Sequence, residues 1–269
     1  MKLTTPSLLA LDLDGTLLKQ RIGVSEGHQR AVAAVRERGI EVVIVTGRPL
    51  ITARAPWADL ALDNELVCFN GVWVGHPDRE PLCAAQLSGP EAAEICAAMT
   101  TYEGVICAYP DSATWLMDHY SERTADWEQS YQVPIGIEPR IRSNWDTPSL
   151  KIMFVAEPAE ITRACAGLRE RFAGRFHVVA SEPDRIEVHH AHATKAWGLA
   201  QLCEQRGIAR DAVWACGDAA NDLEMVSWAG CGFAMGTRCS ELRDRADLCL
   251  PSAQDDGLLA LLPLLDAAS

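Results

Sequence analysis

The chain has 269 residues, 48% of them hydrophobic, and a formal net charge of −13. This length and composition allow a sizeable apolar core in one large domain or two. A strongly negative chain repels phosphate backbones, which argues against a nucleic-acid partner but not against a small anionic substrate bound where cations gather. Asp12 interrupts the first apolar run, and no run approaches the ~20 apolar residues of a membrane span, so we expect a cytoplasmic protein with no membrane partner.

The ten cysteines include no Cys-x-x-Cys pair. Most of them lie inside apolar runs, as Cys68 and Cys107 do. We interpret them as buried, reduced thiols of a cytosolic protein, with disulfides or a zinc site as the alternatives.

The first third of the chain alternates strand-like and helix-like segments. A helix is predicted between Ser25, a good N-cap residue, and Gly39, a good stop. Apolar, β-branched runs on either side predict strands, and the strand–helix alternation favours a parallel sheet covered on both faces. The predicted elements are strand 7–13, helix 25–39, strand 40–47, helix 49–60 and strand 65–71.

The last third repeats this alternation, whereas the middle differs from it. Residues 84–189 contain two strand–helix passages, then two short strands predicted to pair, and they carry three tryptophans that could be core or line a pocket. We therefore predict an α/β fold: a doubly wound, mainly parallel sheet from residues 1–83 and 190–269, with a second α/β domain of residues 84–189 inserted into it. The later elements are helix 90–101, strand 104–110, strand 149–158, helix 159–172, strands 176–180 and 185–190, helix 193–207, strand 211–218, helix 221–230, strand 231–236, a short helix, strand 248–250 and a final helix; the tryptophans are Trp115, Trp127 and Trp145.

Two carboxylates end the first strand. Asp12 and Asp14 are two residues apart, so on a strand they point to the same side, and Gly15-Thr16 then breaks the run. One carboxylate can act as a nucleophile and the other as a general acid and base. Two like charges so placed need a cation or a proton. A simple strand-end turn with solvated aspartates is the alternative.

Two weaker signals suit an anion. Thr46, Gly47 and Arg48 follow the second strand, where a hydroxyl and free backbone N–H groups precede a helix. Lys195 lies in the first turn of a predicted helix, against the helix dipole, and a phosphate ligand would explain its position. The alternatives are an ordinary strand-to-helix turn and a solvated lysine.

A fourth signal follows the strand 211–218. Asp218 and Asp222 are four residues apart and would share a face if a helix has begun, and Asn221 can donate to an anion. A loop with an aspartate cap is the alternative. Three of the four signals end predicted parallel strands, where open α/β sheets bind ligands. Their hard oxygen donors favour Mg²⁺ as cofactor.

These motifs resemble the haloacid dehalogenase superfamily, and more narrowly its Cof-type phosphatases, which have a Rossmann-like core and an inserted α/β cap of the IIB type. The matching segments occur in the family's order and roughly its spacing. They are DLDGTL at 12–17, VTGR at 45–48, CFNG at 68–71, Lys195, and residues 217–236. The resemblance implies that residues 84–189 are the cap.

The resemblance also implies roles for the site residues. Asp12 would attack phosphorus, and Asp14 would protonate the leaving group and then activate water. Mg²⁺ would be held by Asp12, the backbone carbonyl of Asp14 and Asp218, with Asp222 supporting the ion from nearby. The residues expected to bind substrate or phosphate are Thr46, Gly47, Lys195 and Asn221, together with Arg48 and Asn70; a plain hairpin turn is the alternative interpretation of Asn70-Gly71.

The loop before Lys195 departs from the family, which usually has a proline and a glycine there. Here it carries His189, His190 and His192. A transition-metal site is one hypothesis. A polar hinge loop, with imidazoles that are solvated or contact substrate, is the other.

The implied function is a Mg²⁺-dependent phosphatase that hydrolyses a small phosphorylated metabolite, such as a sugar phosphate or pyridoxal phosphate, through an aspartyl-phosphate. The alternative is a phosphomutase or phosphotransferase of the phosphomannomutase type that uses the same intermediate. Asp14 argues against a dehalogenase, which lacks an acid/base residue there. The presence of both Asp12 and Asp14 argues against a non-enzymatic binding protein. Either a monomer or a homodimer is compatible with the sequence.

Overall fold

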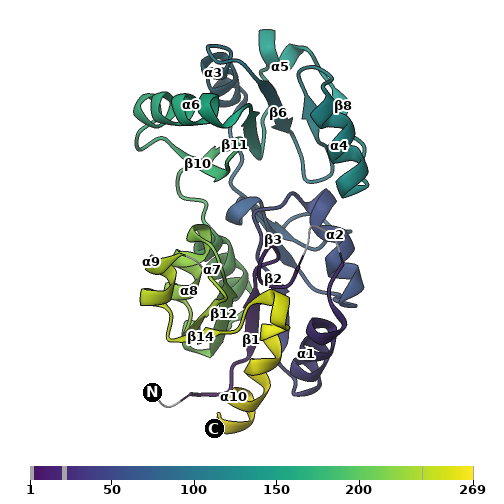
Figure 1. Ribbon diagram of the computed structural model, residues 1–269, viewed down its shortest axis with the longest axis vertical. Helices are drawn as coiled ribbons and strands as arrows, with labels where there is room; N and C mark the ends of the chain where they lie inside the picture. Colours follow the sequence, from purple (N-terminus) through teal and green to yellow (C-terminus); the bar gives the residue numbers. More distant parts are fainter. Residues whose placement is uncertain (1–2, 20–22, 238, 269) are drawn as a thin grey trace. The chain divides into compact units, whose positions relative to one another are not determined.

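The computed structural model describes residues 3–19, 23–237 and 239–268. The chain divides into two compact units, which Figure 1 shows as ribbons. Unit 1 combines the chain up to Arg48, the segment Thr52–Cys83 and the chain from Thr194 onward. Unit 2 consists of Ala84–Ala193 and the short segment Pro49–Ile51.

Unit 1 is built around a five-stranded, fully parallel sheet with the strand order β14-β13-β12-β1-β2. Its three middle strands, β1, β12 and β13, are buried along their whole length, as expected when helices cover both faces. The predicted doubly wound, mainly parallel sheet is confirmed. The strands are β1 (Leu8–Leu11), β2 (Glu41–Ile44), β12 (Val213–Gly217), β13 (Cys231–Met235) and β14 (Leu248–Leu250).

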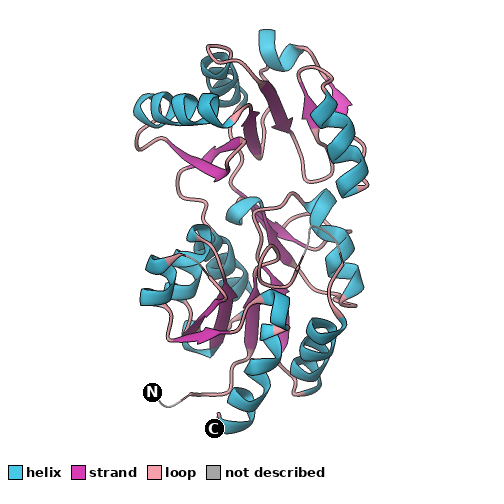
Figure 2. Ribbon diagram, viewed as in Figure 1, coloured by secondary structure: helices cyan, strands magenta, loops and turns pink. Residues whose placement is uncertain are grey.

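Helices of unit 1 flank this sheet (Figure 2). On one face, Leu199 and Leu202 of α7 (Lys195–Arg206) and Met225 of α8 (Leu223–Trp228) share an apolar cluster with the sheet. Helix α1 (Glu26–Glu37) contacts β2 and α10 (Leu261–Ala267). It begins after Ser25, whose side chain accepts the His28 N–H, and stops before Gly39, as predicted. The remaining helices are α2 (Leu50–Asp59) and α9 (Ser240–Arg245), with the short 3₁₀ turns η1 (Phe69–Gly71), η2 (Arg210–Ala212), η3 (Ala220–Asp222), η4 (Ala253–Asp255) and η5 (Gly257–Ala260).

A small antiparallel sheet adjoins β2. Strand β3 (Leu66–Cys68) meets the chain after β2 through one parallel bridge, Val45 with Val67, and then turns back into β4 (Trp73–Gly75). A third strand, β5 (Cys83–Ala84), completes this sheet. The expected strand 65–71 is therefore shorter, because residues 69–71 form a tight turn.

Unit 2 contains a six-stranded mixed sheet with the order β10-β11-β9-β6-β7-β8. Both expected strand–helix passages are present, but β6, β9, β11 and β10 pair antiparallel. Helices α3 (Gly89–Met99) and α6 (Pro158–Arg171) bury apolar side chains against one face of this sheet. The other elements are β6 (Val105–Tyr109), β7 (Leu116–Met117), α4 (Glu122–Tyr131), β8 (Gly136–Ile137), α5 (Arg140–Ser143), β9 (Lys151–Val155), β10 (Phe176–Glu182) and β11 (Arg185–His190), of which β7, β8, α4 and α5 were not anticipated from the sequence.

The cysteines fit the interpretation as reduced thiols, and the tryptophans fit the interpretation as core residues. All ten cysteines are free thiols, and seven of them are buried. Trp115, Trp127 and Trp145 of unit 2 are all buried, at 4%, 3% and 4% exposure, which supports a core role. Among the described residues, no helix combines the length and apolar character that a membrane crossing requires.

Candidate active site

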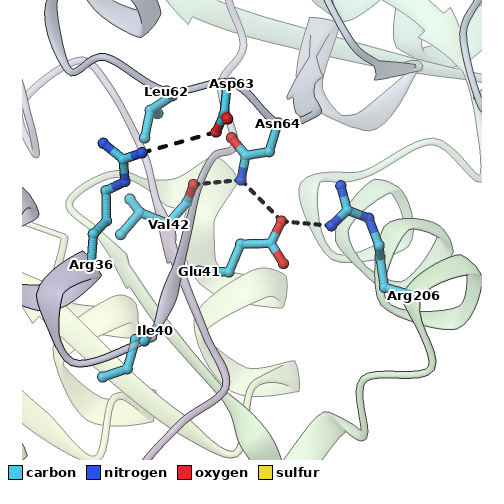
Figure 3. A pocket seen from close by; sticks show the side chains of 9 residues that line it. Arg36, Ile40, Glu41, Val42, Leu62, Asp63, Asn64 and Arg206 are labelled. Carbon is cyan, nitrogen blue, oxygen red and sulfur yellow. Dashed lines mark hydrogen bonds and ion pairs between the residues drawn. The ribbon is translucent and has the colours of Figure 1, made fainter.

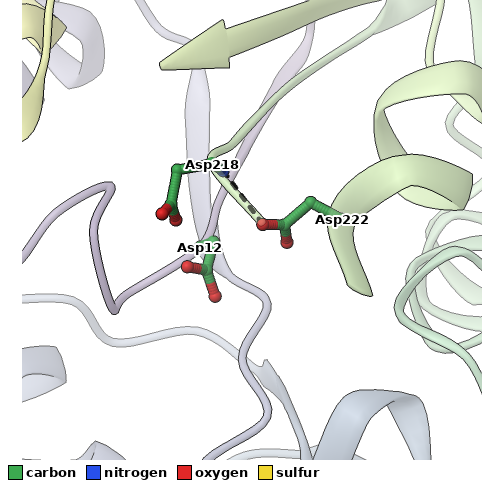
Figure 4. A group of neighbouring side chains, drawn as sticks. All are labelled: Asp12, Asp218 and Asp222. Carbon is green, nitrogen blue, oxygen red and sulfur yellow. Dashed lines mark hydrogen bonds between the residues drawn. The ribbon is translucent and has the colours of Figure 1, made fainter. Parts of the chain in front are cut away.

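Three carboxylates gather at the carboxyl edge of the parallel sheet in unit 1 (Figure 4). Asp12 follows β1 directly, and its N–H donates to the carbonyl of Cys216 on β12 (3.1 Å). Asp218 follows β12, and Asp222 lies at the end of the next turn. Each of the three offers an oxygen within 4.8 Å of the other two. Because the strands are parallel and adjacent, their ends bring together residues more than 200 positions apart in the chain.

Lys195 lies inside this carboxylate group. It is the first residue of α7 and only 1% exposed. Its Nζ donates to Asp12 Oδ1 (2.6 Å) and to Asp222 Oδ1 (2.5 Å). Burial by itself would lower the pKa of Lys195, but the two carboxylates outweigh it and hold that pKa above its ordinary value. The alternative of a solvated surface lysine is therefore wrong.

Asp218 and Asp222 approach each other through a cap, not through a helix face. The residues between them form a 3₁₀ turn, and the Asp222 carboxylate accepts the N–H groups of Asp218 and Ala219, both at 3.0 Å. Gly217 permits this approach, since a Cβ there would lie 2.3 Å from the Asp222 Cβ. The condition for a shared helical face is thus not met, because α8 begins only at Leu223.

The Asp218 carboxylate is held on its other side by the turn after β1. Thr16 Oγ1 donates to Asp218 Oδ1 (3.2 Å). Gly15, at φ 85°, lies so near that an added Cβ would be 2.3 Å from Asp218 Oδ2. Thr237, just beyond β13, donates through Oγ1 to the Asp218 carbonyl. Thr237 was not among the predicted site residues, although its place after an apolar strand of the same sheet was a usable signal.

Negative charge exceeds positive charge in this group. Burial raises the pKa of Asp12 well above its ordinary value, and Asp222, Asp218 and Asp14 add to the effect while Lys195 opposes it. Burial and the neighbouring Asp222 raise the pKa of Asp218 to about 7. Three carboxylates that converge on one buried point, with oxygen as the only donor type, fit a hard divalent cation such as Mg²⁺.

Asp14 lies apart from the three converging carboxylates. Its side chain is 54% exposed, and its two oxygens accept a fork of hydrogen bonds from Arg48 Nε (2.7 Å) and Nη2 (2.5 Å). Arg48, which is 8% exposed, was expected to bind phosphate but is placed on Asp14 here. Such a bidentate, charge-assisted contact fixes the direction of a carboxylate.

The remaining predicted residues lie at neighbouring turns of unit 1. The buried Thr46 accepts the Arg48 N–H at its Oγ1 (3.1 Å). Asn221 Nδ2 donates to Asn70 Oδ1 (3.0 Å), and Gly47 is packed against the Asn70 amide. The structure thus brings the residues after β2, β3 and β12 together, as the strand-end argument predicted.

The histidine loop holds no metal cluster. His190 and His192 pack their rings at 4.2 Å, and His189 packs against His177 at 5.1 Å. Among the described residues, Asp12, Asp218 and Asp222 form the single group with metal-ligand spacing. The geometry of the loop therefore gives no support to the transition-metal hypothesis.

A pocket of unit 1, about 420 Å³, opens at the amino end of β2 (Figure 3). Its charges are largely satisfied within the pocket: Arg206 contacts Glu41 at 3.0 Å, and Arg36 lies 3.9 Å from Asp63. Asn64 Nδ2 donates to Glu41 and to the backbone. Because it lies at the amino end of β2, this pocket is separate from the carboxylate group.

A model of the haloacid dehalogenase-like hydrolases matches residues 9–262, nearly the whole chain and every motif above. The chain belongs to this family. The resemblance inferred from the motifs is therefore confirmed.

Curated relatives match over most of their length. The 5-amino-6-(5-phospho-D-ribitylamino)uracil phosphatase YitU of Bacillus subtilis is 27% identical, with 96% of this chain and 97% of the relative covered. The HMP-PP phosphatase of Cronobacter sakazakii is 29% identical, with 87% and 85% covered. Both relatives are named for phosphatase activity on a small metabolite.

Solved structures confirm the fold. A haloacid dehalogenase-like hydrolase from Bacteroides thetaiotaomicron superposes with a TM-score of 0.85 at 24% identity, covering 97% of this chain and all of the other. The subclass IIB sugar phosphatase BT4131 superposes with a TM-score of 0.78 at 18% identity, covering 97% and 99%. A parallel core sheet with an inserted mixed-sheet unit is thus the architecture of this chain.

Proposed function

We propose that the protein is a Mg²⁺-dependent phosphatase that hydrolyses a small phosphorylated metabolite through a phosphoryl group carried on Asp12. The protein is a phosphoric monoester hydrolase of the haloacid dehalogenase type. The observation that carries the finer proposal is the buried group in which Lys195 Nζ lies 2.6 Å from Asp12 Oδ1 beside two further carboxylates.

Asp12 is suited to attack phosphorus. It is 4% exposed and fixed at the end of a buried strand, so its carboxylate is oriented before substrate arrives. Lys195 holds one Asp12 oxygen, which leaves the other available as the nucleophile. The same ammonium, with Thr46, Gly47 and Asn221 nearby, would bind the phosphoryl oxygens and stabilise charge in the transition state.

Asp14 is suited to transfer protons at the same centre. It follows Asp12 by two residues, and the Arg48 fork holds its carboxylate in one direction. In this role Asp14 would protonate the leaving oxygen and later remove a proton from the water that attacks the Asp12 phosphoryl group. Arg48 would orient Asp14 during both steps.

The three carboxylates of Asp12, Asp218 and Asp222 are the reason that we expect the activity to require Mg²⁺. Asp12 and Asp218, with Asp222 beside them, would hold Mg²⁺, which when bound supplies positive charge for the phosphoryl oxygens. The raised pKa values of Asp12 and Asp218 reflect carboxylates that are crowded and buried without sufficient positive charge. Thr16 and the Asp222 cap keep these carboxylates aimed at one point.

Phosphate release from a panel of esters tests the proposal. The panel contains sugar phosphates, pyridoxal phosphate, flavin mononucleotide, 5-amino-6-(5-phospho-D-ribitylamino)uracil and HMP-PP, each with Mg²⁺ and with EDTA. We expect release that requires Mg²⁺, and a loss of at least ~10⁴-fold in Asp12→Asn with the circular dichroism spectrum unchanged.

The outcomes separate the alternatives. Activity retained in Asp12→Asn would remove the nucleophile assignment. Phosphoryl transfer to a sugar hydroxyl without net phosphate release would favour a mutase or phosphotransferase. Release that is equal in EDTA would contradict the cation requirement.

A further inference from the structure

The turn between β3 and β4 has an unusual backbone. Phe69, Asn70 and Gly71 adopt φ values of 54°, 56° and 100°, three consecutive residues in the left-handed region. A residue with a Cβ rarely adopts this region, least of all a bulky one such as phenylalanine. The turn is also buried, with Phe69 at 0% and Asn70 at 7% exposure. Such a conformation persists only where the surrounding structure holds it in place.

One side of the turn fixes the loop after β2. The Asn70 N–H donates to the Thr46 carbonyl (3.0 Å), and the Phe69 N–H donates to the Arg48 carbonyl (3.0 Å). Gly47 lies between these two carbonyls, and a Cβ on it would be 2.8 Å from Asn70 Oδ1. The Asn70 amide is therefore pressed against the segment proposed to bind phosphate.

The other side of the turn meets the start of α7. A Cβ on Gly71 would lie 1.9 Å from the carbonyl oxygen of Thr194, the residue before Lys195. A Cβ on Gly198, one turn into α7, would lie 2.8 Å from the Gly71 Cα. The turn is thus wedged between two segments of the site, and Asn70 has little freedom to move.

Asn221 depends on this rigid neighbour. Asn221 is exposed, and an exposed amide samples several rotamers when nothing holds it. Its Nδ2 donates one hydrogen to Asn70 Oδ1 at 3.0 Å. An asparagine amide has two N–H groups, so the second could donate to a phosphoryl oxygen.

We propose that Asn70 is a positioning residue that acts through Asn221, and that the left-handed turn Phe69–Gly71 exists to hold the Asn70 amide in place. This assignment rests on the proposed phosphatase function. It differs from the expectation that Asn70 binds phosphate itself. The consequence is that removal of the Asn70 amide weakens phosphate binding through Asn221.

A double-mutant cycle tests this dependence. Asn70→Gly keeps a residue that tolerates the left-handed backbone and removes the amide, whereas Asn221→Ala removes the proposed phosphate donor. The readouts are inorganic phosphate binding by calorimetry with Mg²⁺, and kcat and KM for p-nitrophenyl phosphate. Each single variant is expected to weaken phosphate binding ~10-fold, and the double variant to lie within ~2-fold of Asn221→Ala.

Ala61→Gly is the matched control. Ala61 is an exposed residue of unit 1 at φ 49°, so the glycine relieves the same kind of backbone strain away from the site. Phosphate binding and kcat/KM should not change in this variant.

The outcomes of the cycle are distinct. The positioning role would be overturned if the affinity losses of the two single variants multiply in the double variant. It would also be overturned if Asn70→Gly binds phosphate as tightly as the wild type. A wild-type protein that binds phosphate but cleaves no ester would remove the proposed function, while the binding cycle would still decide the part played by Asn70. A wild-type protein that does neither would overturn both.

Discussion

Each unit of the molecule buries a lysine against carboxylates, and the two settings differ in charge balance. In unit 1, the Lys195 ammonium lies among Asp12, Asp218 and Asp222, so negative charge is in excess. In unit 2, Lys151 Nζ lies 2.9 Å from Glu187 Oε1 and 5.1 Å from the centre of the Tyr109 ring.

The contrast separates a site from a structural pair. A buried pair of one positive and one negative charge can be neutral as a whole, although its net contribution to stability is small. A buried group with excess carboxylates is satisfied only by protons or by an added cation, which is what the raised pKa values of Asp12 and Asp218 indicate. The excess charge therefore marks the functional site, and burial of a lysine alone does not.

The largest effect on stability is expected from breaking the balanced pair. Glu187→Gln removes the carboxylate that lies 2.9 Å from the 1% exposed Lys151 ammonium, which should destabilise unit 2 by about 3–5 kcal/mol. Hydrogen exchange of the β9 and β11 amides measures this locally. The double variant Lys151→Met/Glu187→Leu is the control and should recover most of the loss. A single variant as stable as the wild type would show that the pair has other support.

A second effect in unit 2 depends on pH. His189 is fully buried beside His177 and near Glu187 and Lys151, and burial, with His177, lowers its pKa from 6.5 to about 4. Between these values the unfolded chain binds a proton that the folded chain does not, so stability falls as the pH is lowered. The loss should reach about 3 kcal/mol at pH 4.

His189→Phe tests this pH dependence, because it keeps an aromatic ring against His177 and removes the titratable imidazole. Unfolding in urea at several pH values should give a flatter profile between pH 6.5 and 4 for the variant. An identical slope in both proteins would mean that other groups set the acid sensitivity.

The smallest effect has the opposite sign and belongs to the unbalanced group. Asp218→Asn removes one of three crowded negative charges while keeping an acceptor for Thr16. In EDTA at pH 8 it should stabilise the protein by about 1–2 kcal/mol, because it relieves burial and repulsion of the charge. The variant should also lose the rise in thermal midpoint that Mg²⁺ gives the wild type. If Asp218→Asn is less stable than the wild type in EDTA, the Asp218 charge is already balanced in the folded protein. The contrast between the Lys195 and Lys151 settings would then be weaker.

Local sequence patterns were sufficient to predict the five-stranded parallel sheet of unit 1 and the segments of its site, but not the strands β4 and β5. Apolar β-branched runs between capped helices predict a parallel sheet, and polar residues at the strand ends must then share one edge. Asp12, Thr46 and Asp218 could be placed together in this way because strand direction follows from the order of elements. The order of the six strands in unit 2 was not predictable, since β7, β8 and α4 lack a clear period and their pairing depends on distant partners.

What the tertiary structure alone decided is which groups face one another. Spacing suggested that Asp218 and Asp222 share a helix face, but the chain forms a cap there, because Gly217 allows the closer approach. The hydrogen bonds between Arg48 and Asp14 were likewise not predicted from the sequence. Asn70-Gly71 suggested a turn, but the left-handed backbone of Phe69 has no sequence signature, because phenylalanine adopts such a backbone only when long-range packing compels it. Sequence determines the direction and order of the elements, whereas charge partners and strained backbones are set by contacts between segments far apart in the chain.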